Sequence, residues 1–496
     1  MAAAASIRIH ANRPSHVVSR YLYSQFIEHL GRCVYGGIWV GEDSKIANDG
    51  GLRLDTVAAL KRLKLPALRW PGGCFADNYH WMDGIGPRDR RPKRQNLWWR
   101  QPESNAFGTD EFMRFCKLIS TEPYVCVNVG SGTVEEARSW IEYCNGTQPS
   151  SIVEMRVANG HPEPYNVKFW GVGNESWGCG GNLRPEFAAD LCRQYATYMR
   201  QAAGPDAKLT AVGSEPSVPD WDERFLDTLG EFVELVDYIG VHVYSGKGIA
   251  EIEFSDDDYK RLLVDDVKRK TDYIKRAIET VRAHTTPRRA FGLILDEWGI
   301  WYKEATIERG HWQQSTMQDA LFTAISFHKF HELAANLFMA NIAQTINVLQ
   351  ALILTQGPQL VCTPTYHVFD LFMPHRDGRF VPCDATKVPT IKSPQGNEAA
   401  ALSASATLSA DGKELFVSVV NLDISGAYST KIEIKDATPW ALRHVRRLCT
   451  GNLRSHNTFD EPENVVPQDV LVEAGATLDE MTFPAQSVTT VRLTAR

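Results

Sequence analysis

Two glutamates far apart in the chain each follow an apolar run, and together they could hydrolyse a glycosidic bond. Glu175 comes shortly after residues 167–172 and is preceded by Asn174, and Glu297 comes shortly after residues 291–295. One protonated and one ionised carboxyl group are sufficient for this chemistry. An apolar run that ends in a carboxylate is typical of a buried strand whose carboxyl end opens into the active site of an α/β barrel.

The residues next to the two glutamates indicate which one acts as the general acid/base and which one as the nucleophile. Asn174 is an amide donor for the sugar hydroxyl next to the reacting carbon, which favours Glu175 as the general acid/base and Glu297 as the nucleophile. A single glutamate at a strand end is more often a structural ion-pair partner. Two of them, each followed closely by Trp, favour catalysis. A retaining enzyme needs its carboxyl groups only ~5–5.5 Å apart, so that one can attack the anomeric carbon directly.

For these two carboxylates to meet, the strands that carry them must end at one rim. Strand-like segments recur at residues 22–30, 67–70, 124–129, 167–172, 209–212, 238–244, 291–295 and 337–345. Most are separated by helical patterns, at residues 52–64, 110–119, 134–143, 185–203, 225–236 and 256–282. Strands that alternate with helices indicate parallel βαβ units. Eight such units favour a closed (β/α)8 TIM barrel, with Glu175 ending strand four and Glu297 ending strand seven.

The pattern changes at about residue 385, where helical patterns give way to short β-rich runs. These runs lie at residues 400–408, 415–420, 430–434, 442–448 and 488–493, and they predict an antiparallel β-sandwich. The alternating residues 6–11 predict an N-terminal strand that completes this sandwich. We therefore expect a barrel of residues 18–384 and a sandwich of residues 1–17 and 385–496, which suits a chain of 496 residues.

Composition excludes several classes of protein. The chain is 43% hydrophobic and 23% charged, and its net charge of -7 gives no reason to expect a nucleic-acid partner. No apolar run approaches the length of a membrane span. The N-terminus lacks the basic start and apolar core of a signal peptide, so we expect a cytoplasmic protein.

The ten cysteines are scattered, without a CxxC pair. This distribution favours free thiols in a reducing compartment over a disulfide framework or a zinc site. A metal-dependent barrel hydrolase would need several histidines at strand ends, and His242 alone is well placed. We therefore expect neither a metal nor a cofactor.

Several motifs, spread in order from residue 25 to residue 350, carry a family resemblance. They are Gln25-Phe-Ile-Glu28-His-Leu-Gly31, Leu68-Arg-Trp-Pro-Gly-Gly-Cys-Phe-Ala-Asp77, Tyr79-His-Trp-Met-Asp-Gly-Ile-Gly-Pro87, Phe107-Gly-Thr-Asp-Glu-Phe112, Gly171-Val-Gly-Asn-Glu175, Asp296-Glu-Trp298 and Asn347-Val-Leu-Gln350. The chain resembles glycoside hydrolase family 51, the α-L-arabinofuranosidases of clan A. The resemblance implies a barrel with a C-terminal sandwich, net retention, Asn-Glu as the acid/base motif, and a homo-oligomer, a hexamer.

The resemblance also implies roles for residues beyond the two glutamates. Glu28 is expected to hydrogen-bond the furanose hydroxyls, and Gln350 to bind arabinose hydroxyls. Arg69 is expected to hold the nucleophile ionised through a charge-assisted bond. His242 and Tyr244 have the spacing that places both side chains on one face of a strand. Tyr244 would orient Glu297, and His242 would orient Glu175.

Aromatic residues and some departures from the family pattern concern the pocket wall. Trp99 is expected to form a wall of the sugar pocket, and Trp177 and Trp301 to stack on the aglycone. Cys74 stands where other members have Asn, and it is still expected to contact the sugar. Other departures lie at the pocket rim, at Gly240, Val243 and Gly299.

The leading hypothesis is a retaining exo-enzyme that releases terminal α-L-arabinofuranosyl residues from arabinoxylan or arabinan oligosaccharides. An endo-glucanase, xylanase or β-xylosidase on the same barrel is an alternative. A non-catalytic carbohydrate-binding protein is an alternative of another class, which would tolerate loss of either glutamate.

Overall fold

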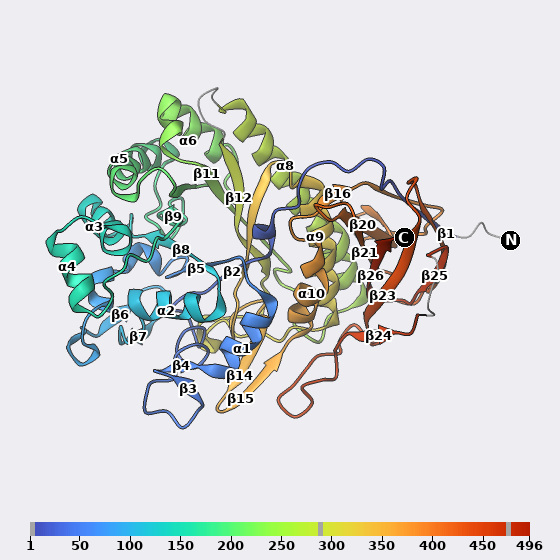
Figure 1. The fold of residues 1–496 in the computed structure, drawn as a ribbon, viewed down its shortest axis with the longest axis horizontal. Coiled ribbons are helices and arrows are strands. Elements are labelled where there is room, and N and C mark those ends of the chain that lie inside the picture. The colour runs from blue at the N-terminus through green and yellow to red at the C-terminus, as the bar shows by residue number, and fades with distance from the viewer. Residues whose placement is uncertain (1–4, 286–290, 473–477) are drawn as a thin grey trace.

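A closed barrel of eight parallel strands forms the larger part of the molecule (Figure 1). The computed structural model describes residues 5–285, 291–472 and 478–496. In barrel order the strands are β2 (Ser24–Phe26), β5 (Ala67–Trp70), β8 (Glu122–Val127), β9 (Phe169–Val172), β10 (Lys208–Val212), β11 (Tyr238–Ser245), β12 (Gly292–Ile300) and β13 (Leu337–Ala343). All neighbouring strands of the barrel pair in parallel. Parallel pairing requires each connection to cross back to the end of the barrel where the previous strand began, and the helices on the outside make these crossings. The predicted TIM barrel is confirmed.

Helices surround the barrel, as Figure 1 shows. They are α1 (Leu54–Leu63), α2 (Thr109–Ile119), α3 (Val134–Asn145), α4 (Ser151–Ala158), α5 (Pro185–Ala203), α6 (Trp221–Leu229), α7 (Asp256–Lys260), α8 (Val267–Ala283), α9 (Met317–Leu333) and α10 (Pro364–Phe372). The helix predicted over residues 256–282 is divided, because a π-helical turn, η6 (Arg261–Asp266), separates α7 from α8. The described residues form no helix that has both the length and the apolarity needed to span a bilayer.

Short turns and hairpins connect these elements. The 3-10 turns are η1 (Arg20–Tyr23), η2 (Ala76–Asn78), η3 (Trp81–Gly84), η4 (Arg88–Arg90), η5 (Gly230–Leu235), η7 (Ile307–Arg309) and η8 (Met373–His375). The two-stranded hairpins are β3 (Asn48–Asp49) with β4 (Leu52–Arg53), β6 (Arg94–Asn96) with β7 (Gln101–Glu103), β14 (Ile353–Gln356) with β15 (Gln359–Cys362), and β18 (Thr390–Lys392) with β19 (Glu398–Ala400).

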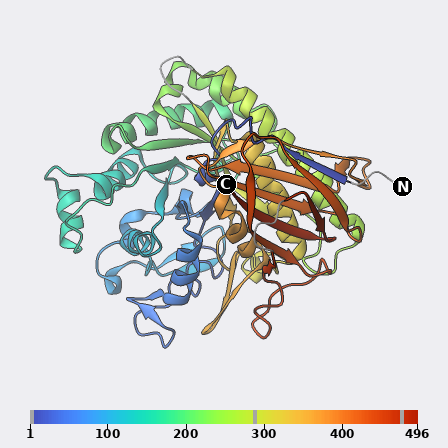
Figure 2. The ribbon, with the colours of Figure 1, turned by 45° about the vertical axis from the view of Figure 1, so that its right-hand side comes forward.

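A β-sandwich of two sheets packs beside the barrel (Figure 2). The six-stranded sheet has the order β16 (Arg379–Val381), β20 (Leu402–Leu408), β21 (Glu414–Asn421), β26 (Ser487–Ala495), β23 (Trp440–Cys449) and β24 (Gln468–Val470). The four-stranded sheet has the order β17 (Cys383–Thr386), β1 (Ala5–Ile9), β22 (Tyr428–Ile434) and β25 (Glu480–Phe483). The N-terminal strand β1 thus completes the sandwich, as predicted. Its pairing with β22 is parallel, whereas its pairing with β17 is antiparallel.

The strand pairing bears on where one domain ends and the other begins. Both β16 and β17 belong to the sandwich sheets, although both begin before residue 385. Turn η8 directly follows α10, the last helix of the barrel. We therefore propose that the boundary lies between His375 and Arg379, a few residues before the position expected from composition.

An irregularity in the barrel brings catalytic candidates side by side. The register between β11 and β12 shifts between Val241 and His242, so that His242 lies opposite Glu297 and Tyr244 lies opposite Gly299. Such a bulge redirects the side chains that follow it. Strand β12 continues to Ile300, so Glu297 lies within the strand rather than after it.

Candidate active site

The structure brings Glu175 and Glu297 together at the rim of the barrel. His242 lies between them, with Nδ1 2.8 Å from Glu175 Oε1 and 3.6 Å from Glu297 Oε2. One carboxyl oxygen of each glutamate and a nitrogen of His242 all lie within 4.8 Å of one another. At this separation both carboxyl groups can reach the same sugar carbon.

Glu297 is buried and held by charge-assisted hydrogen bonds. Arg69 Nη1 donates to Oε1 at 2.8 Å, and the Tyr244 hydroxyl donates to Oε2 at 2.6 Å. Burial alone would raise the pKa of Glu297, but the charges of His242 and Arg69 and the bond from Tyr244 outweigh it and hold this pKa below its ordinary value. This carboxyl group is therefore ionised at rest.

Arg69 organises both sides of the site. It is fully buried, and its Nη2 donates to Asn174 Oδ1 at 2.8 Å while Nη1 holds Glu297. This bond fixes the amide of Asn174, whose Nδ2 donates to Cys179 Sγ at 3.7 Å. Asp296 also forms an ion pair with Arg69, with Asp296 Oδ2 3.4 Å from Arg69 Nε. Sequence reasoning did not single out Asp296, although it directly precedes Glu297.

A buried aspartate that was not predicted, Asp77, positions the loop that carries Glu175. Its Oδ2 accepts a hydrogen bond from the backbone N–H of Asn174 at 2.9 Å, and its Oδ1 accepts from Val129 N at 2.9 Å and Gly130 N at 3.1 Å. Burial raises the pKa of Asp77 to about 7 despite these bonds. Asp77 thus joins the loops after strands β5, β8 and β9.

The prediction that all ten cysteines are free was wrong at two positions. Cys74 and Cys179 form a disulfide, although 105 residues separate them, and the other eight cysteines are free. Sequence spacing could not show this, because the barrel rim alone brings the two loops together. Cys179 Sγ lies 3.5 Å and Cys74 Sγ lies 4.0 Å from Glu175 Oε2. Cys74 therefore lines the pocket as half of a disulfide, not as a thiol.

Glu28 is fixed by three donors on the other side of the pocket. Its Oε1 accepts from Trp99 Nε1 at 2.9 Å and from Phe75 N at 3.0 Å, and its Oε2 accepts from Gln344 Nε2 at 2.9 Å. Burial raises the pKa of Glu28 to about 7. A Cβ at Gly72 would lie 2.4 Å from Glu28 Cγ, so only glycine allows this approach.

The two glutamines near strand β13 have different surroundings. Gln350 is buried, its Oε1 accepts from Ile300 N at 3.0 Å, and its Nε2 donates to Thr323 Oγ1 at 2.8 Å. The oxygen of this amide supports the end of β12 and its nitrogen binds helix α9, so its contact with sugar stays a prediction. Gln344, which was not predicted, is the amide that contacts Glu28.

Aromatic rings line one side of the site. The rings of Trp99 and His311 meet edge to face, with their centroids 5.0 Å apart. The centroid of His311 lies 5.2 Å from that of Trp301, and the centroid of Trp301 lies 5.2 Å from that of Tyr244. Trp177 lies on the loop after β9, and its Nε1 donates to Gly213 O at 3.0 Å. Trp99, Trp177 and Trp301 are each half-buried, which leaves part of every ring available to a ligand.

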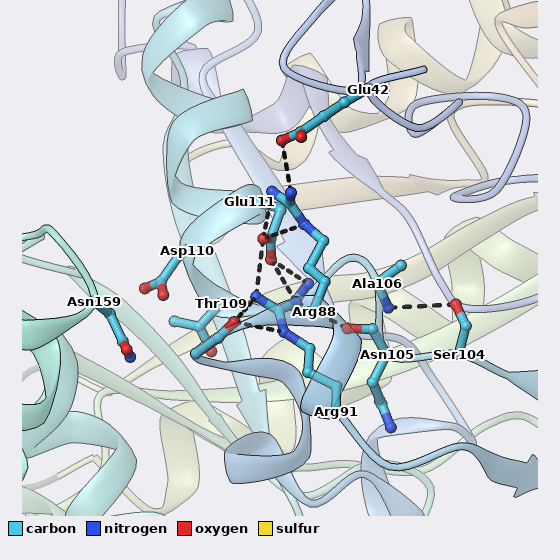
Figure 3. Close-up of polar contacts among 12 residues, drawn as sticks. Glu42, Arg88, Arg91, Ser104, Asn105, Ala106, Thr109, Asp110, Glu111 and Asn159 are labelled. Atoms are coloured by element: carbon cyan, nitrogen blue, oxygen red, sulfur yellow. Dashed lines mark hydrogen bonds and ion pairs between the residues drawn. The ribbon is translucent and has the colours of Figure 1, made fainter. Parts of the chain in front are cut away.

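The long connection between β5 and α2 carries Trp99 and is braced by ion pairs, shown in Figure 3. Glu111 accepts from Arg91 Nη1 and Nη2, both at 3.0 Å, and from Arg88 Nε at 3.1 Å. The same carboxylate accepts from Gly108 N at the start of α2. One side chain thus fixes turn η4 relative to helix α2.

Comparison with known proteins identifies similar chains along nearly the full length. A model described as "Alpha-L-arabinofuranosidase 1 domain" matches residues 59–261, and one described as "Alpha-L-arabinofuranosidase C-terminal domain" matches residues 296–487. An intracellular exo-alpha-L-arabinofuranosidase of Bacteroides ovatus is 39% identical over 99% of this chain and 95% of its own length.

Solved structures give the same result. The GH51 arabinofuranosidase of Xanthomonas axonopodis pv. citri superimposes with a TM-score of 0.91 at 35% identity, over 99% of this chain and 100% of that one. The alpha-L-arabinofuranosidase of Thermotoga maritima, solved in an arabinose complex, superimposes with a TM-score of 0.86 at 33% identity, over 98% and 99% of the two chains.

Proposed function

The chain belongs to the α-L-arabinofuranosidases of glycoside hydrolase family 51, and we propose that it releases terminal α-L-arabinofuranosyl residues from arabinoxylan or arabinan oligosaccharides by double displacement. The observation that carries this proposal is the cluster of Glu175, His242 and Glu297, whose polar atoms lie within 4.8 Å of one another. That spacing allows direct attack by one carboxylate on the sugar carbon and leaves no room for an intervening water.

In the first half of the reaction Glu297 attacks the anomeric carbon. Glu297 is the ionised member, because Arg69 and Tyr244 stabilise its charge. Glu175 gives a proton to the glycosidic oxygen as the bond from the anomeric carbon to that oxygen breaks. The leaving alcohol departs, and the sugar stays attached to Glu297 as an ester.

In the second half the roles of the acid and base reverse. Glu175, now a carboxylate, takes a proton from a water molecule, which attacks the anomeric carbon and releases Glu297. Two inversions at one carbon give net retention. His242 contacts both glutamates and can follow the charge as it moves between them.

The depth of the site supports release of a single terminal sugar. Glu28, Asn174 and Arg69 are almost fully buried, so little of each side chain is open to a ligand. Trp99 lies beside them and is tied to Glu28 by its indole N–H. A terminal furanose fits such a pocket, whereas the middle of a polymer does not.

An NMR time course on an arabinoxylo-oligosaccharide tests the proposal. We expect α-L-arabinofuranose to appear first, before the anomers equilibrate, with the unsubstituted xylo-oligosaccharide as the other product. The Glu297→Ala variant serves as the blank. A β-anomer as the first product would contradict double displacement, and shorter xylan fragments would favour the endo-acting alternative.

Two further properties of the enzyme are proposed from the family. We propose that it acts inside the cell, since it is similar over 99% of its length to a relative named intracellular. We propose that it assembles as a hexamer, as the family resemblance implies. Cell fractionation tests the first property and light scattering on the purified protein tests the second. Activity confined to the culture medium, or a mass of about 56 kDa, would contradict them.

A further inference from the structure

The Cys74–Cys179 bond joins the two loops that flank the reacting carboxylates. Cys74 follows Gly73 on the loop after β5, and a Cβ at Gly73 would lie 2.9 Å from Glu297 Oε1. Cys179 lies on the loop after β9, and its Sγ is 3.5 Å from Glu175 Oε2. Both sulfurs of the crosslink therefore lie beside the acid/base, at 4.0 Å and 3.5 Å from Glu175 Oε2, and the residue before Cys74 packs against the nucleophile.

The loop that carries the acid/base needs such a crosslink. It contains Gly173, Gly178, Gly180 and Gly181, and glycine loses more conformational freedom on folding than any other residue. Glu175 itself has a φ of 37°, a left-handed conformation that is unfavourable for a non-glycine residue. The disulfide at Cys179, four residues after Glu175, reduces the number of conformations that this loop can adopt.

Five of the eight free cysteines are buried and poorly suited to thiol chemistry. Burial raises the pKa values of Cys33, Cys126 and Cys192 to about 12, and burial likewise raises those of Cys116 and Cys144. A thiol must ionise to react, so these cysteines are inert. Cys74 and Cys179, by contrast, are half-exposed at the pocket.

We propose that Cys74 and Cys179 form a thiol–disulfide exchange site whose redox state controls acid/base catalysis by Glu175. The oxidised pair holds Glu175 in place for proton transfer, and reduction by a dithiol weakens that step. This inference rests on the proposed role of Glu175. Inside a cell, where thiols are usually kept reduced, disulfides are commonly catalytic or redox-sensing, which suits a bond at a catalytic carboxylate.

The exchange is an ordinary transfer of two electrons. A thiolate of the dithiol attacks one sulfur of the pair, the S–S bond breaks, and the other cysteine leaves as a thiolate that takes up a proton. The second thiol of the reductant then attacks the mixed disulfide. The reductant ends as its own disulfide, and Cys74 and Cys179 end as two thiols that have gained two electrons and two protons.

Reduction acts on Glu175 more than on Glu297. Glu297 lies within strand β12 and keeps its bonds from Arg69 and Tyr244. Glu175 keeps its contact with His242, but its loop loses its covalent anchor. Proton donation to the leaving group therefore suffers while nucleophilic attack does not. Activated aryl glycosides, which need little protonation, should be nearly indifferent to reduction.

The test compares two substrates in two redox states of the purified enzyme. The value of kcat/KM is measured before and after treatment with excess dithiothreitol, on an arabinoxylo-oligosaccharide and on an activated nitrophenyl arabinofuranoside. We expect a loss of about tenfold on the oligosaccharide and less than about twofold on the aryl glycoside. Reoxidation should restore the oligosaccharide activity. Mass spectrometry after alkylation reports the state of the pair at each stage.

Variants separate this effect from general damage. Cys74→Ser and Cys179→Ser should reproduce the reduced kinetics and lose the response to dithiothreitol. Cys449→Ser, at a free cysteine of the sandwich strand β23, should keep the full response. Thermal unfolding of each variant identifies those that fail to fold. The comparison of the unmodified enzyme before and after dithiothreitol does not depend on the folding of these variants.

Three results would overturn the inference: a pair that stays reduced under oxidising conditions, equal loss on both substrates, or no loss after complete reduction. Glu175→Ala on the same substrates distinguishes this failure from failure of the proposed function. If Glu175 is the acid/base, Glu175→Ala damages the oligosaccharide reaction far more than the aryl reaction, whatever the disulfide does.

Discussion

At the scale of single residues, the ionisation of Glu297 depends on the hydroxyl of Tyr244. That hydroxyl donates to Glu297 Oε2 at 2.6 Å and lowers the pKa of the carboxyl group, against the effect of burial. Tyr244→Phe should therefore raise this pKa, and the nucleophile should become protonated at a higher pH. A lost hydrogen bond to a charged group, about 1.5–3 kcal/mol, corresponds to a shift of about one pH unit or more.

The pH profile of kcat/KM measures this effect. We expect the acidic limb to move to higher pH in Tyr244→Phe, with the plateau also lowered. Tyr198→Phe, on an exposed face of α5, is the matched control and should leave the profile unchanged. An acidic limb that stays in place in Tyr244→Phe would show that Glu297 does not set it.

Removal of the nucleophile is the most direct test at this scale. Glu297→Ala should lower kcat by at least about 10³-fold, because the variant lacks the carboxylate that we propose forms the glycosyl ester. Azide can enter the space left by the side chain and attack the anomeric carbon once. The rescued product should therefore be the inverted glycosyl azide, identified by NMR. Near-normal turnover without azide would end the assignment.

The residues that sequence reasoning found and those that it missed differ in how they act. Glu175, Glu297, Arg69 and Glu28 lie on or next to barrel strands, and parallel strands deliver such side chains to one rim. The missed residues act through a neighbour: Asp77 holds the backbone of Asn174, Gln344 holds Glu28, and Cys179 pairs with Cys74. Their partners lie far away in sequence, so no local pattern marks them.

At the scale of elements, helix α9 was not predicted because it has no polar face. Nearly all of its side chains are buried, since the helix lies between the barrel and the sandwich. A helix buried on every side lacks the alternation on which periodicity depends. The short strands β24 and β25 were missed for a related reason, because three or four residues are too few to show a period.

The connection that carries Trp99 gives a prediction for an element as a whole. Glu111 pairs with both Arg88 and Arg91, and it is nearly buried. Glu111→Gln removes the charge and leaves the buried Arg91 without its counter-ion, while Arg88 keeps its pair with Glu42. Loss of one partner of a buried pair typically costs about 3–5 kcal/mol. Looser support for Trp99 should raise KM for the oligosaccharide several-fold more than it lowers kcat.

Steady-state kinetics and thermal unfolding test this together. Glu135→Gln is a matched control, because Glu135 pairs with Arg138 on the exposed surface of α3, where an ion pair contributes little. Unchanged stability and KM in Glu111→Gln would show that the connection is supported by its packing alone.

At the scale of the whole molecule, buried histidines join the barrel helix α9 to the sandwich. His328 contacts Ser403 Oγ at 2.8 Å and Ser418 Oγ at 3.0 Å, and His331 contacts Ser405 Oγ at 2.8 Å. These bonds tie α9 to strands β20 and β21 of the six-stranded sheet. The two domains are thus joined by hydrogen bonds of neutral histidine side chains, and protonation of these histidines would disrupt the interface.

Acid should therefore weaken the union of the two domains. Burial lowers the pKa of His375 to about 3, and it holds those of His328 and His331 well below the ordinary value. The unfolded chain binds protons at these histidines below about pH 6.5, whereas the folded chain does not, so stability falls as pH decreases from there. Each histidine adds a slope of up to about 1.4 kcal/mol per pH unit, until the pH reaches its folded pKa.

The measurement is the unfolding free energy or Tm between about pH 4 and pH 8. A His328→Gln, His375→Gln double variant should lose part of the acid-side slope, since glutamine does not titrate. As the pH falls, it should therefore retain a larger share of its own neutral-pH stability than the original protein does. His444→Gln, on the exposed surface of strand β23, should keep the slope of the original protein. Parallel curves for the double variant and the original protein would locate the acid sensitivity elsewhere, in the carboxylates of the barrel.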